Sequence, residues 1–448
     1  MKYTTLFPSQ FSLGALATAL PILVDPKVGI VHHVEEVPTE PGSPNFFHYS
    51  AQACNTSAFC SQANFANTGG ASSHRPIAIA KAVGEAIERY CAAIYDHGQL
   101  PLSSYRDAPF ACARPSDFAL HTTEQYQEAG FPWVPFENTT PIKWTPARRL
   151  IDGTAMYVPA AFVWIPYLYY QGSGDTPIGQ PISTGLACHG SYARAALSGL
   201  CEVIERDAFM IFWLAKLSCP HLRVETLSDA NYDLVKRFES TGDRVVLLNI
   251  TTDNSIPTIL AILCSEASER PAFVFAAATE PDPEQAVRKA LEELAHTRRY
   301  SQQIKRRLPP IMADNDYEQV LNQIDHLNFA GDHASKELFD FAFASTKRQD
   351  FDDLISLTTG NAENDLETVV QRVHATGHEV LIADLSSADV VDLGLHVVRC
   401  VVPGYQPLFM GHRIRALGGI RLRTVPERLG YSQKACEASI NTAPHPYP

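Results

Sequence analysis

Short apolar runs alternate along the chain with longer segments in which apolar residues recur every three or four positions. The first pattern is typical of β-strands and the second of helices that bury one side. The apolar runs predict strands at 29–37, 156–165, 243–251, 258–265, 271–279, 378–386 and 396–404. The periodic segments predict long helices at 76–98, 191–217 and 281–308, and weaker helices near 316–327 and 364–376.

The mixture of both element types predicts an α/β or α+β fold in which mixed sheets are flanked by helices. Residues 95–150 are rich in Pro, Phe and Tyr and show little periodicity, so we expect an irregular connection there. Residues 328–362 are polar and irregular, which favours an insertion or a mobile lid over that range.

Composition adds that the chain is globular and poorly suited to bulk binding of nucleic acid. Hydrophobic residues make up 45% of its 448 residues, enough for a sizeable core. Lys and Arg number 36 against 49 Asp and Glu, which gives a formal charge of −13. An anionic ligand must therefore be met by local cations, either side chains or metal.

Cysteine spacing and hydropathy favour a cytoplasmic protein that does not cross a membrane. The ten cysteines are scattered, with no C-x-x-C and no cluster at zinc-ligand spacing, which is typical of reduced thiols. No apolar segment reaches the roughly 18–20 residues that a membrane helix needs. The signal-like start is interrupted by Pro8 and Pro21, so we do not expect a signal peptide.

One acidic motif occurs twice and indicates where the chemistry lies. The two copies are Glu85, Glu88 and Arg89 in the first long helix and Glu202, Glu205 and Arg206 in the second. In each copy the two carboxylates lie one turn apart on one helix face. Ordinary solvated helix surfaces give the same pattern and are the alternative for each copy taken alone. Because the spacing recurs after a similar preceding segment, we expect both copies to serve one site.

The preceding segments, 67–73 and 183–190, are rich in small residues and are expected to be loops. Such loops offer backbone N–H groups and a helix N-terminus to anions such as phosphate, although neither matches a known phosphate-loop or dinucleotide motif. Four carboxylates in one partly dry site repel each other, and Mg²⁺ relieves the repulsion while bridging to phosphates. The pattern therefore indicates a site for a magnesium nucleotide.

The third long helix supplies further groups that fit the same site. Lys289 and Glu293 are one turn apart, and His296 follows one turn later. A surface ion pair and a structural histidine are the alternatives for these residues.

Taken in order, these motifs resemble the YcaO family. They are G-E-A-I-E-R, then S-T-G-L-A with E-V-I-E-R-D-A, then K-A-L-E-E-L and V-V-P-G-Y-Q-P, and the likeness runs from about residue 20 to the end of the chain. The resemblance implies a YcaO-type ATP-binding fold, with mixed sheets flanked by helices, that uses ATP and Mg²⁺. It also implies a single domain over 1–448, with 1–60 as an N-terminal segment.

Carried over residue by residue, the resemblance implies the following site residues. The metal ligands are Glu85, Glu88, Glu202, Glu205 and Glu293, of which the first four also belong to the ATP site, and the phosphate contacts are Arg206 and Lys289. The family more often has Arg at position 289, Gln at 296 and Gly-Lys-Gly at 70–72, where this chain has Gly-Ala-Ser. Lys289 keeps the charge of Arg but not its bidentate geometry, and His296 and Ala71 receive no role.

The tail 441–448 ends in P-x-P-x-P, which resembles the terminus of azoline-forming YcaO cyclodehydratases. Without that context, a disordered tail or a ligand for an SH3-like groove would be expected. The resemblance implies that the tail enters the active site and that the Pro448 carboxylate acts as a base or orients the nucleophile.

These enzymes phosphorylate a backbone amide oxygen with ATP after a Cys, Ser or Thr side chain has attacked the carbonyl, and thiazoline or oxazoline forms as phosphate leaves. Their substrates are ribosomal precursor peptides, including those of bacteriocins. The resemblance thus implies an ATP-dependent peptide cyclodehydratase of thiazole- and oxazole-modified peptide biosynthesis.

The resemblance also implies partners. Related enzymes bind the leader of the precursor peptide through an E1-like protein, and the start of this chain resembles the start of the YcaO part itself, so we expect a separate E1-like partner. No flavin motif is visible, so azoline oxidation would belong to a separate flavin-dependent dehydrogenase. We expect neither nucleic acid nor membrane as a partner, and the oligomeric state stays open, with a homodimer among the candidates.

Two other functions stay open. One is a different YcaO reaction, thioamide or amidine formation, which the P-x-P-x-P tail disfavours. The other is a non-catalytic docking subunit that binds nucleotide, which the intact set of glutamates disfavours.

Overall fold

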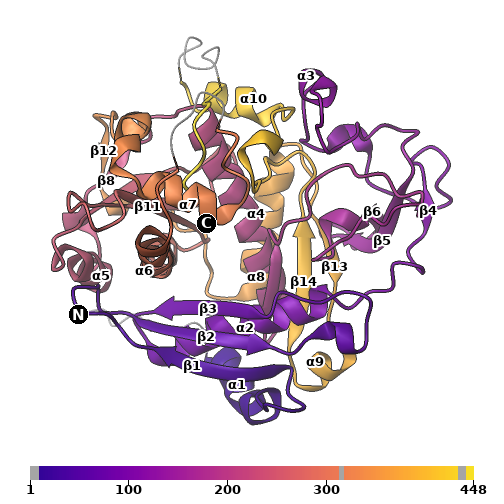
Figure 1. Ribbon diagram of the computed structural model, residues 1–448, viewed down its shortest axis with the longest axis horizontal. Coiled ribbons are helices and arrows are strands. Elements are labelled where there is room, and N and C mark those ends of the chain that lie inside the picture. The colour runs from indigo at the N-terminus through magenta and orange to yellow at the C-terminus, as the bar shows by residue number, and fades with distance from the viewer. Residues whose placement is uncertain (1–9, 312–316, 432–439) are drawn as a thin grey trace.

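Three β-sheets form the framework of the protein in this computed structural model, which describes residues 10–311, 317–431 and 440–448 (Figure 1). Their strand orders are β1-β2-β3, β11-β10-β9-β8-β12 and β4-β5-β13-β14-β7, and β6 also pairs with β5. The pairings are antiparallel, apart from a short parallel contact between β8 and β12. Helices pack between and around the sheets, so the expected mixed α/β fold is confirmed.

The first sheet consists of β1 (Val31–Val37), β2 (Phe47–Ala53) and β3 (Asn67–Ser72), and α2 (Arg75–Ala92) packs against it, with α1 (Gln10–Leu23) behind. The prediction of a loop at 67–73 was wrong, because most of this segment is strand β3. Its small residues serve close packing instead. A Cβ on Gly70 would lie 2.6 Å from the carbonyl oxygen of Ala78 in α2.

The second sheet lies between helices on both faces. It consists of β8 (His221–Leu222), β9 (Arg244–Asn249), β10 (Thr258–Cys264), β11 (Phe273–Thr279) and β12 (Arg348–Gln349). One face packs against α5 (Asp229–Glu239) and α6 (Pro283–Arg307), and the other packs against the second half of α4 (Tyr192–Leu214). Because both faces are covered, β10 and β11 are buried along their whole length and read in the sequence as continuous apolar runs.

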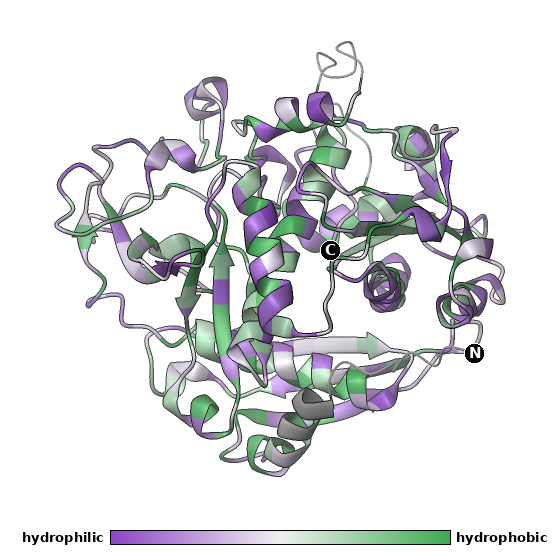
Figure 2. Cartoon of the chain, turned by 180° about the vertical axis from the view of Figure 1, so that it is seen from behind, coloured by the Kyte–Doolittle hydropathy of each residue, from purple (hydrophilic) through white to green (hydrophobic). Residues whose placement is uncertain are grey.

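The third sheet consists of β4 (Leu102–Ser103), β5 (Ile142–Arg149), β6 (Ala155–Pro159), β7 (Leu186–His189), β13 (Leu381–Asp384) and β14 (His396–Val401). The first half of α4 and α8 (Ala362–Ala375) cover one face, while α2 covers the other. Helix α4 therefore contacts two sheets, and its middle lies where they meet. Figure 2 shows apolar residues on many of the sheet strands, while the helices carry both apolar and hydrophilic residues.

Several predicted elements have different bounds in the structure. The strand expected at 156–165 ends at Pro159 and continues as a 3₁₀ turn, and the connection 95–150 contains β4, α3 (Thr123–Gln127) and β5. Helix α7 (Gln323–Gly331) replaces the helix expected near 316–327, whose first residue lies outside the described residues. The short helices α9 (Ala388–Asp392) and α10 (Arg421–Arg428) were not expected.

The segment 328–362 is anchored in the core at its beginning. Phe329 and Phe339 are fully buried beside the second half of α4. That the segment moves as a lid stays a prediction, and such a movement would leave these two side chains in the core. The nine described cysteines are free thiols. Of the helices that the structure describes, none is both long and apolar enough to span a membrane.

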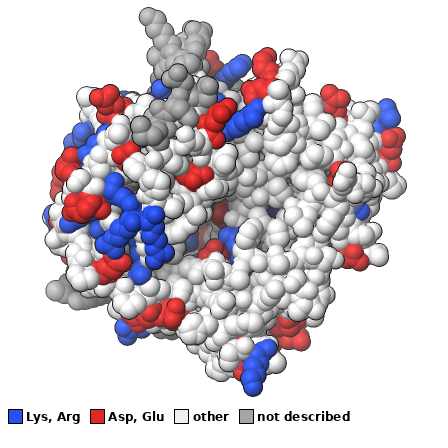
Figure 3. Space-filling model, in the orientation of Figure 1, with Lys and Arg blue, Asp and Glu red and all other residues white. Residues whose placement is uncertain are grey.

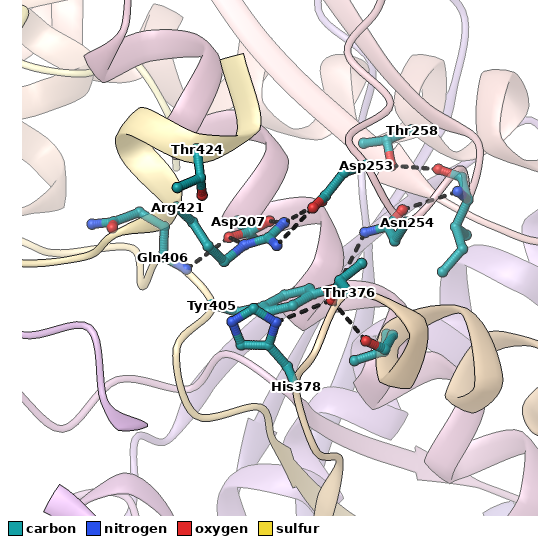
Figure 4. A network of polar contacts seen from close by, with 12 residues as sticks. Asp207, Asp253, Asn254, Thr258, Thr376, His378, Tyr405, Gln406, Arg421 and Thr424 are labelled. Atoms are coloured by element: carbon teal, nitrogen blue, oxygen red, sulfur yellow. Dashed lines mark hydrogen bonds and ion pairs between the residues drawn. The ribbon is translucent and has the colours of Figure 1, made fainter. Parts of the chain in front are cut away.

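A buried ion network fixes α4 to the C-terminal part of the chain (Figure 4). Arg421 donates two hydrogen bonds to Asp207, of 2.9 and 2.7 Å, and two to Asp253, of 2.9 and 3.4 Å. Its guanidinium carbon lies 4.1 Å from the ring centre of Tyr405, and Asp207 also accepts from the backbone N–H of Gln406. Because each buried charge has partners, the network holds α4 in one position along and around its axis.

Candidate active site

The first glutamate pair joins α2 to two strands. Glu88 accepts a 2.8 Å hydrogen bond from the backbone N–H of Cys188 in β7. Glu85 accepts one of 3.2 Å from the N–H of Gly69 in β3 and pairs with Arg89 at 3.1 Å. Both carboxylates of this pair therefore contact the backbone of neighbouring strands, unlike the solvated carboxylates of an ordinary helix surface.

The second pair lies in the middle of α4. Glu202 accepts from the backbone N–H of Gly185 at 3.2 Å and from Arg206 at 3.5 Å. Glu205 accepts a hydrogen bond from the hydroxyl of Tyr447, and Nε of Arg206 lies 3.8 Å from Oε1 of Glu205. Gly185 precedes β7, so part of the segment 183–190 is a loop, as expected, while the rest is strand.

Electrostatic coupling shows that the structure brings the glutamates of α2, α4 and α6 together. Burial raises the pKa of Glu88 to about 8, and Glu85 and Glu202 act in the same direction, although Arg89 opposes them. Burial also raises the pKa of Glu205 to about 7 despite Arg206 and Tyr447, and like charges on Glu202 and Glu293 add to the rise. Carboxylates on α2, α4 and α6 therefore influence one another, whereas their binding of one metal stays a prediction.

Helix α6 contributes two contacts that the sequence did not predict. Lys289 donates to Glu280, which follows β11. Burial lowers the pKa of Lys289, but Glu280 outweighs this effect and the net pKa is raised. His296 packs against Gly69, where a Cβ would come within 2.6 Å of the ring. Glu280 carries no signal in the sequence, because its partner is nine residues away and on another element.

The neighbour of Glu293 has a different role. Glu292 forms a 2.8 Å ion pair with Lys81 and accepts from the hydroxyl of Ser72 at 2.6 Å. Burial would raise the pKa of Glu292, but Lys81 and these hydrogen bonds lower it to about 2. Lys81 also donates to the carbonyl of Ala71, so this group joins α2, β3 and α6 beside the glutamates.

The tail 441–448 is buried along α4 and reaches the second glutamate pair. Trp213 donates to the carbonyl of Ala443 at 3.1 Å, and the Tyr447 ring lies 4.2 Å from that of Phe209. Arg206 donates a 2.7 Å hydrogen bond to an oxygen of Pro448, and its guanidinium carbon lies 4.6 Å from the Tyr447 ring centre. The tail therefore touches both a predicted metal ligand and a predicted phosphate contact.

One face of the protein surface is hollowed. Figure 3 shows a hollow near the middle of one face, with acidic and basic side chains inside it and a largely uncharged rim around much of it. Among residues 10–311, 317–431 and 440–448, no three His, Cys, Asp or Glu side chains are already arranged to hold an ion. The donor set nevertheless fits Mg²⁺, because the ligands are carboxylates, and a hard cation would offset the burial and, to a smaller extent, the like charges that raise the pKa of Glu88 and Glu205.

Comparison with known proteins identifies the family. Residues 69–406 match the family model described as YcaO cyclodehydratase, ATP- and Mg²⁺-binding. The match covers most of the chain, which therefore belongs to the YcaO family, an ATP- and Mg²⁺-binding family of heterocyclases.

Solved structures share this fold at low sequence identity. A heterocyclase in complex with substrate and cofactor is 20% identical, with a TM-score of 0.76 over 96% of this chain and 57% of that chain. YcaO from Methanopyrus kandleri bound with AMPPCP and Mg²⁺ is 22% identical, with a TM-score of 0.61 over 84% of this chain and 86% of that one. The E. coli microcin synthetase McbBCD complex contains a chain that is 15% identical, with a TM-score of 0.57 over 92% and 96%. The chain thus spans little more than half of the first structure.

Proposed function

We propose that this protein is an ATP-dependent cyclodehydratase that converts Cys, Ser or Thr residues of a ribosomal precursor peptide into thiazolines or oxazolines. The observation that carries the proposal is the meeting of carboxylates from α2, α4 and α6 with the proline-rich tail in a YcaO fold. The heterocyclase with bound substrate and cofactor supports the same reaction class through its fold.

The proposed reaction explains why these residue types are needed. The peptide side chain attacks the preceding amide carbonyl, and the resulting oxyanion takes the γ-phosphoryl group of ATP. The attack itself closes the ring; the ring nitrogen then loses its proton and phosphate leaves, which forms the C=N bond of the azoline, because a phosphorylated oxygen leaves far more readily than an amide oxygen. Bound Mg²⁺ would neutralise phosphate charge during this transfer.

Each group of side chains has a proposed task. The glutamates hold the metal, and they are Glu85, Glu88, Glu202, Glu205 and Glu293. Arg206 and Lys289 contact the phosphates, exchanging their present contacts with Pro448 and Glu280 for the ligand. The carboxyl group of Pro448 takes the proton of the attacking side chain or orients that side chain. Before ATP binds, it contacts Arg206, and the hydrogen bond from Tyr447 to Glu205 would keep the tail beside the glutamates once Arg206 has turned to the phosphates.

Partner proteins are part of the proposal. An E1-like protein would bind the leader of the precursor peptide, and a separate flavin-dependent dehydrogenase would oxidise azolines where azoles are the product. The similarity to a chain of the microcin synthetase complex supports work within such an assembly. A homodimer is a further proposed arrangement.

Substitution of Glu205 by Gln tests the proposal. We expect no ATP-dependent loss of water from the precursor peptide by mass spectrometry and an unchanged circular dichroism spectrum, because Gln keeps the shape and removes the charge. Glu202→Gln should behave alike. Glu367→Gln, on the exposed side of α8, is the matched control and should retain full activity.

Other product masses would distinguish the alternatives. A gain of sulfur in place of oxygen in the wild-type product would indicate thioamide formation. No phosphate release with partner and precursor present would indicate a docking subunit. Full activity of Glu205→Gln would refute the assigned metal role.

A further inference from the structure

A buried arginine on β14 has an unused hydrogen-bond donor. Arg399 is 3% exposed. Its Nε donates to the carbonyl of Phe162 at 3.2 Å, and its Nη2 donates to that of Ile182. Its Nη1 is also buried and, within the described part of the chain, has no hydrogen-bond partner. Two backbone carbonyls thus fix the guanidinium in place and leave one nitrogen unoccupied.

The charge of Arg399 also lacks a direct partner. None of the ion pairs found in residues 10–311, 317–431 and 440–448 includes it. Burial lowers the pKa of Arg399 to about 10, with Glu202 acting to raise it and Arg89 acting to lower it. The side chain therefore remains charged at neutral pH. A buried cation without a paired anion is costly, which points to a partner that arrives with a ligand.

The position of Arg399 is at the edge of the glutamate site. On β14, Val398 and Cys400 face the core around α4, whereas Val397 faces the core around α2. Alternation along the strand therefore places Arg399 on the α2 side.

Its cross-strand neighbour is Leu186 of β7. The preceding residue, Gly185, donates to Glu202 and accepts from the N–H of Cys400. One short connection thus joins the strand of the arginine to a predicted metal ligand.

We infer that Arg399 binds an anionic oxygen of the reacting groups through its free Nη1. The oxygen belongs either to the terminal phosphate of ATP or to the oxyanion formed when the peptide carbonyl is attacked, since both develop negative charge beside the metal ligands. This inference rests on the proposed function and adds a binding residue to it. Its two carbonyl contacts keep the guanidinium in place before the ligand arrives, which limits the entropy lost on binding.

A purely structural role would be satisfied by fewer donors. Bracing the segments around residues 162 and 182 uses Nε and Nη2 only. A bracing residue should therefore affect the stability of the free protein and leave unchanged the extra stability that a ligand confers.

Calorimetry on Arg399→Gln and Arg399→Lys tests the inference, with AMPPCP and Mg²⁺ as the probe. If Nη1 contacts phosphate, both variants should bind the analogue roughly 10- to 100-fold more weakly, because a hydrogen bond between charged groups contributes about 1.5–3 kcal/mol. Their thermal stabilisation by the analogue should fall in parallel. Arg244→Gln, which removes an exposed arginine of β9, is the control and should bind normally.

A second measurement, of turnover, tests whether the anionic oxygen belongs to the peptide oxyanion. Analogue affinity would then stay within twofold, while ATP-dependent water loss from a synthetic Gly-Cys peptide, with the wild-type protein as reference, would fall by a similar 10- to 100-fold. Normal affinity together with normal turnover in both variants would overturn the inference, as would turnover losses that a lower melting temperature of the free protein fully explains.

The outcomes separate the inference from the proposed function. If the wild-type protein forms no ring, the cyclodehydratase proposal is refuted. If Arg399→Gln nevertheless weakens binding of the analogue, the role of Arg399 in anion binding is retained. Conversely, ring formation with normal kinetics in both variants keeps the cyclodehydratase and refutes the role of Arg399.

Discussion

Replacing Glu88 by Gln should remove a measurable share of the pH dependence of stability in the metal-free protein. Burial, with Glu85 and Glu202, raises the pKa of Glu88 from 4.5 to about 8. Between these values the folded protein keeps a proton that the unfolded chain has lost. The contribution of this group to the unfolding free energy is therefore complete below pH 4.5 and decreases as the pH rises toward 8.

The size of the effect follows from the same pKa. One pKa unit corresponds to about 1.4 kcal/mol, so the full rise sets an upper limit of about 5 kcal/mol. Glu88 is partly exposed, and water screens its charge, so we expect about 2 kcal/mol. Gln has the same shape without a charge. Glu88→Gln should therefore match the wild type near pH 5 and exceed its stability by about 2 kcal/mol above pH 8.

Urea unfolding at several pH values, in the presence of a chelator, measures this difference. Glu367→Gln serves as the control, because this exposed carboxylate on α8 should leave the pH profile unchanged. Adding Mg²⁺ with AMPPCP should restore the unfolding free energy of the wild type at high pH and have little effect on that of Glu88→Gln. Parallel stability profiles for wild type and Glu88→Gln would refute the idea that the folded state holds this carboxyl protonated.

Three further results are expected. Tyr447→Phe removes the hydroxyl that donates to Glu205 and keeps the aromatic ring. Azoline formation, followed by mass spectrometry, should fall roughly tenfold, while the unfolding free energy in urea changes by about 1 kcal/mol; unchanged turnover would contradict this. One residue added after Pro448 should lower ring formation roughly 10²–10⁴-fold with unchanged calorimetric affinity for AMPPCP, and full activity would reduce the tail to a packing element. Gly70→Ala should lose about 1–3 kcal/mol in urea unfolding, because its Cβ would meet the backbone of α2, whereas Gly84→Ala, which has open space, should be neutral or stabilising.

Apolar pattern alone predicted the buried strands and the long helices, because elements covered on both faces leave continuous apolar runs. It missed β2, whose buried and exposed positions alternate irregularly. It also missed β5, which contains Pro146 and a buried Lys143. The amino group of Lys143 is satisfied by the carbonyls of His97 and Leu100, contacts that exist only after the chain has folded.

The candidate site divides in the same way. The repeated glutamate motif singled out its members because two copies share one spacing, and in the structure the charge of Glu202 acts on Glu88 and that of Glu293 on Glu205. Glu280, Arg399 and Tyr447 carry no such signal. Each acquires its place through partners on other elements, and one charged or aromatic residue on an apolar strand or tail looks ordinary in sequence.

The contact of α4 with two sheets has a consequence for how the protein matures. Its first half packs on the third sheet and its second half on the second sheet, so the glutamates between them meet α2 and α6 only after both sheets have docked. Contacts of such long sequence separation form slowly. We therefore expect partly folded chains to lack the nucleotide site, so that magnesium nucleotide binds only the fully folded protein. At a concentration 100 times its dissociation constant it would add about 2.7 kcal/mol to that state, which makes the substrate a thermodynamic aid to its own enzyme's folding.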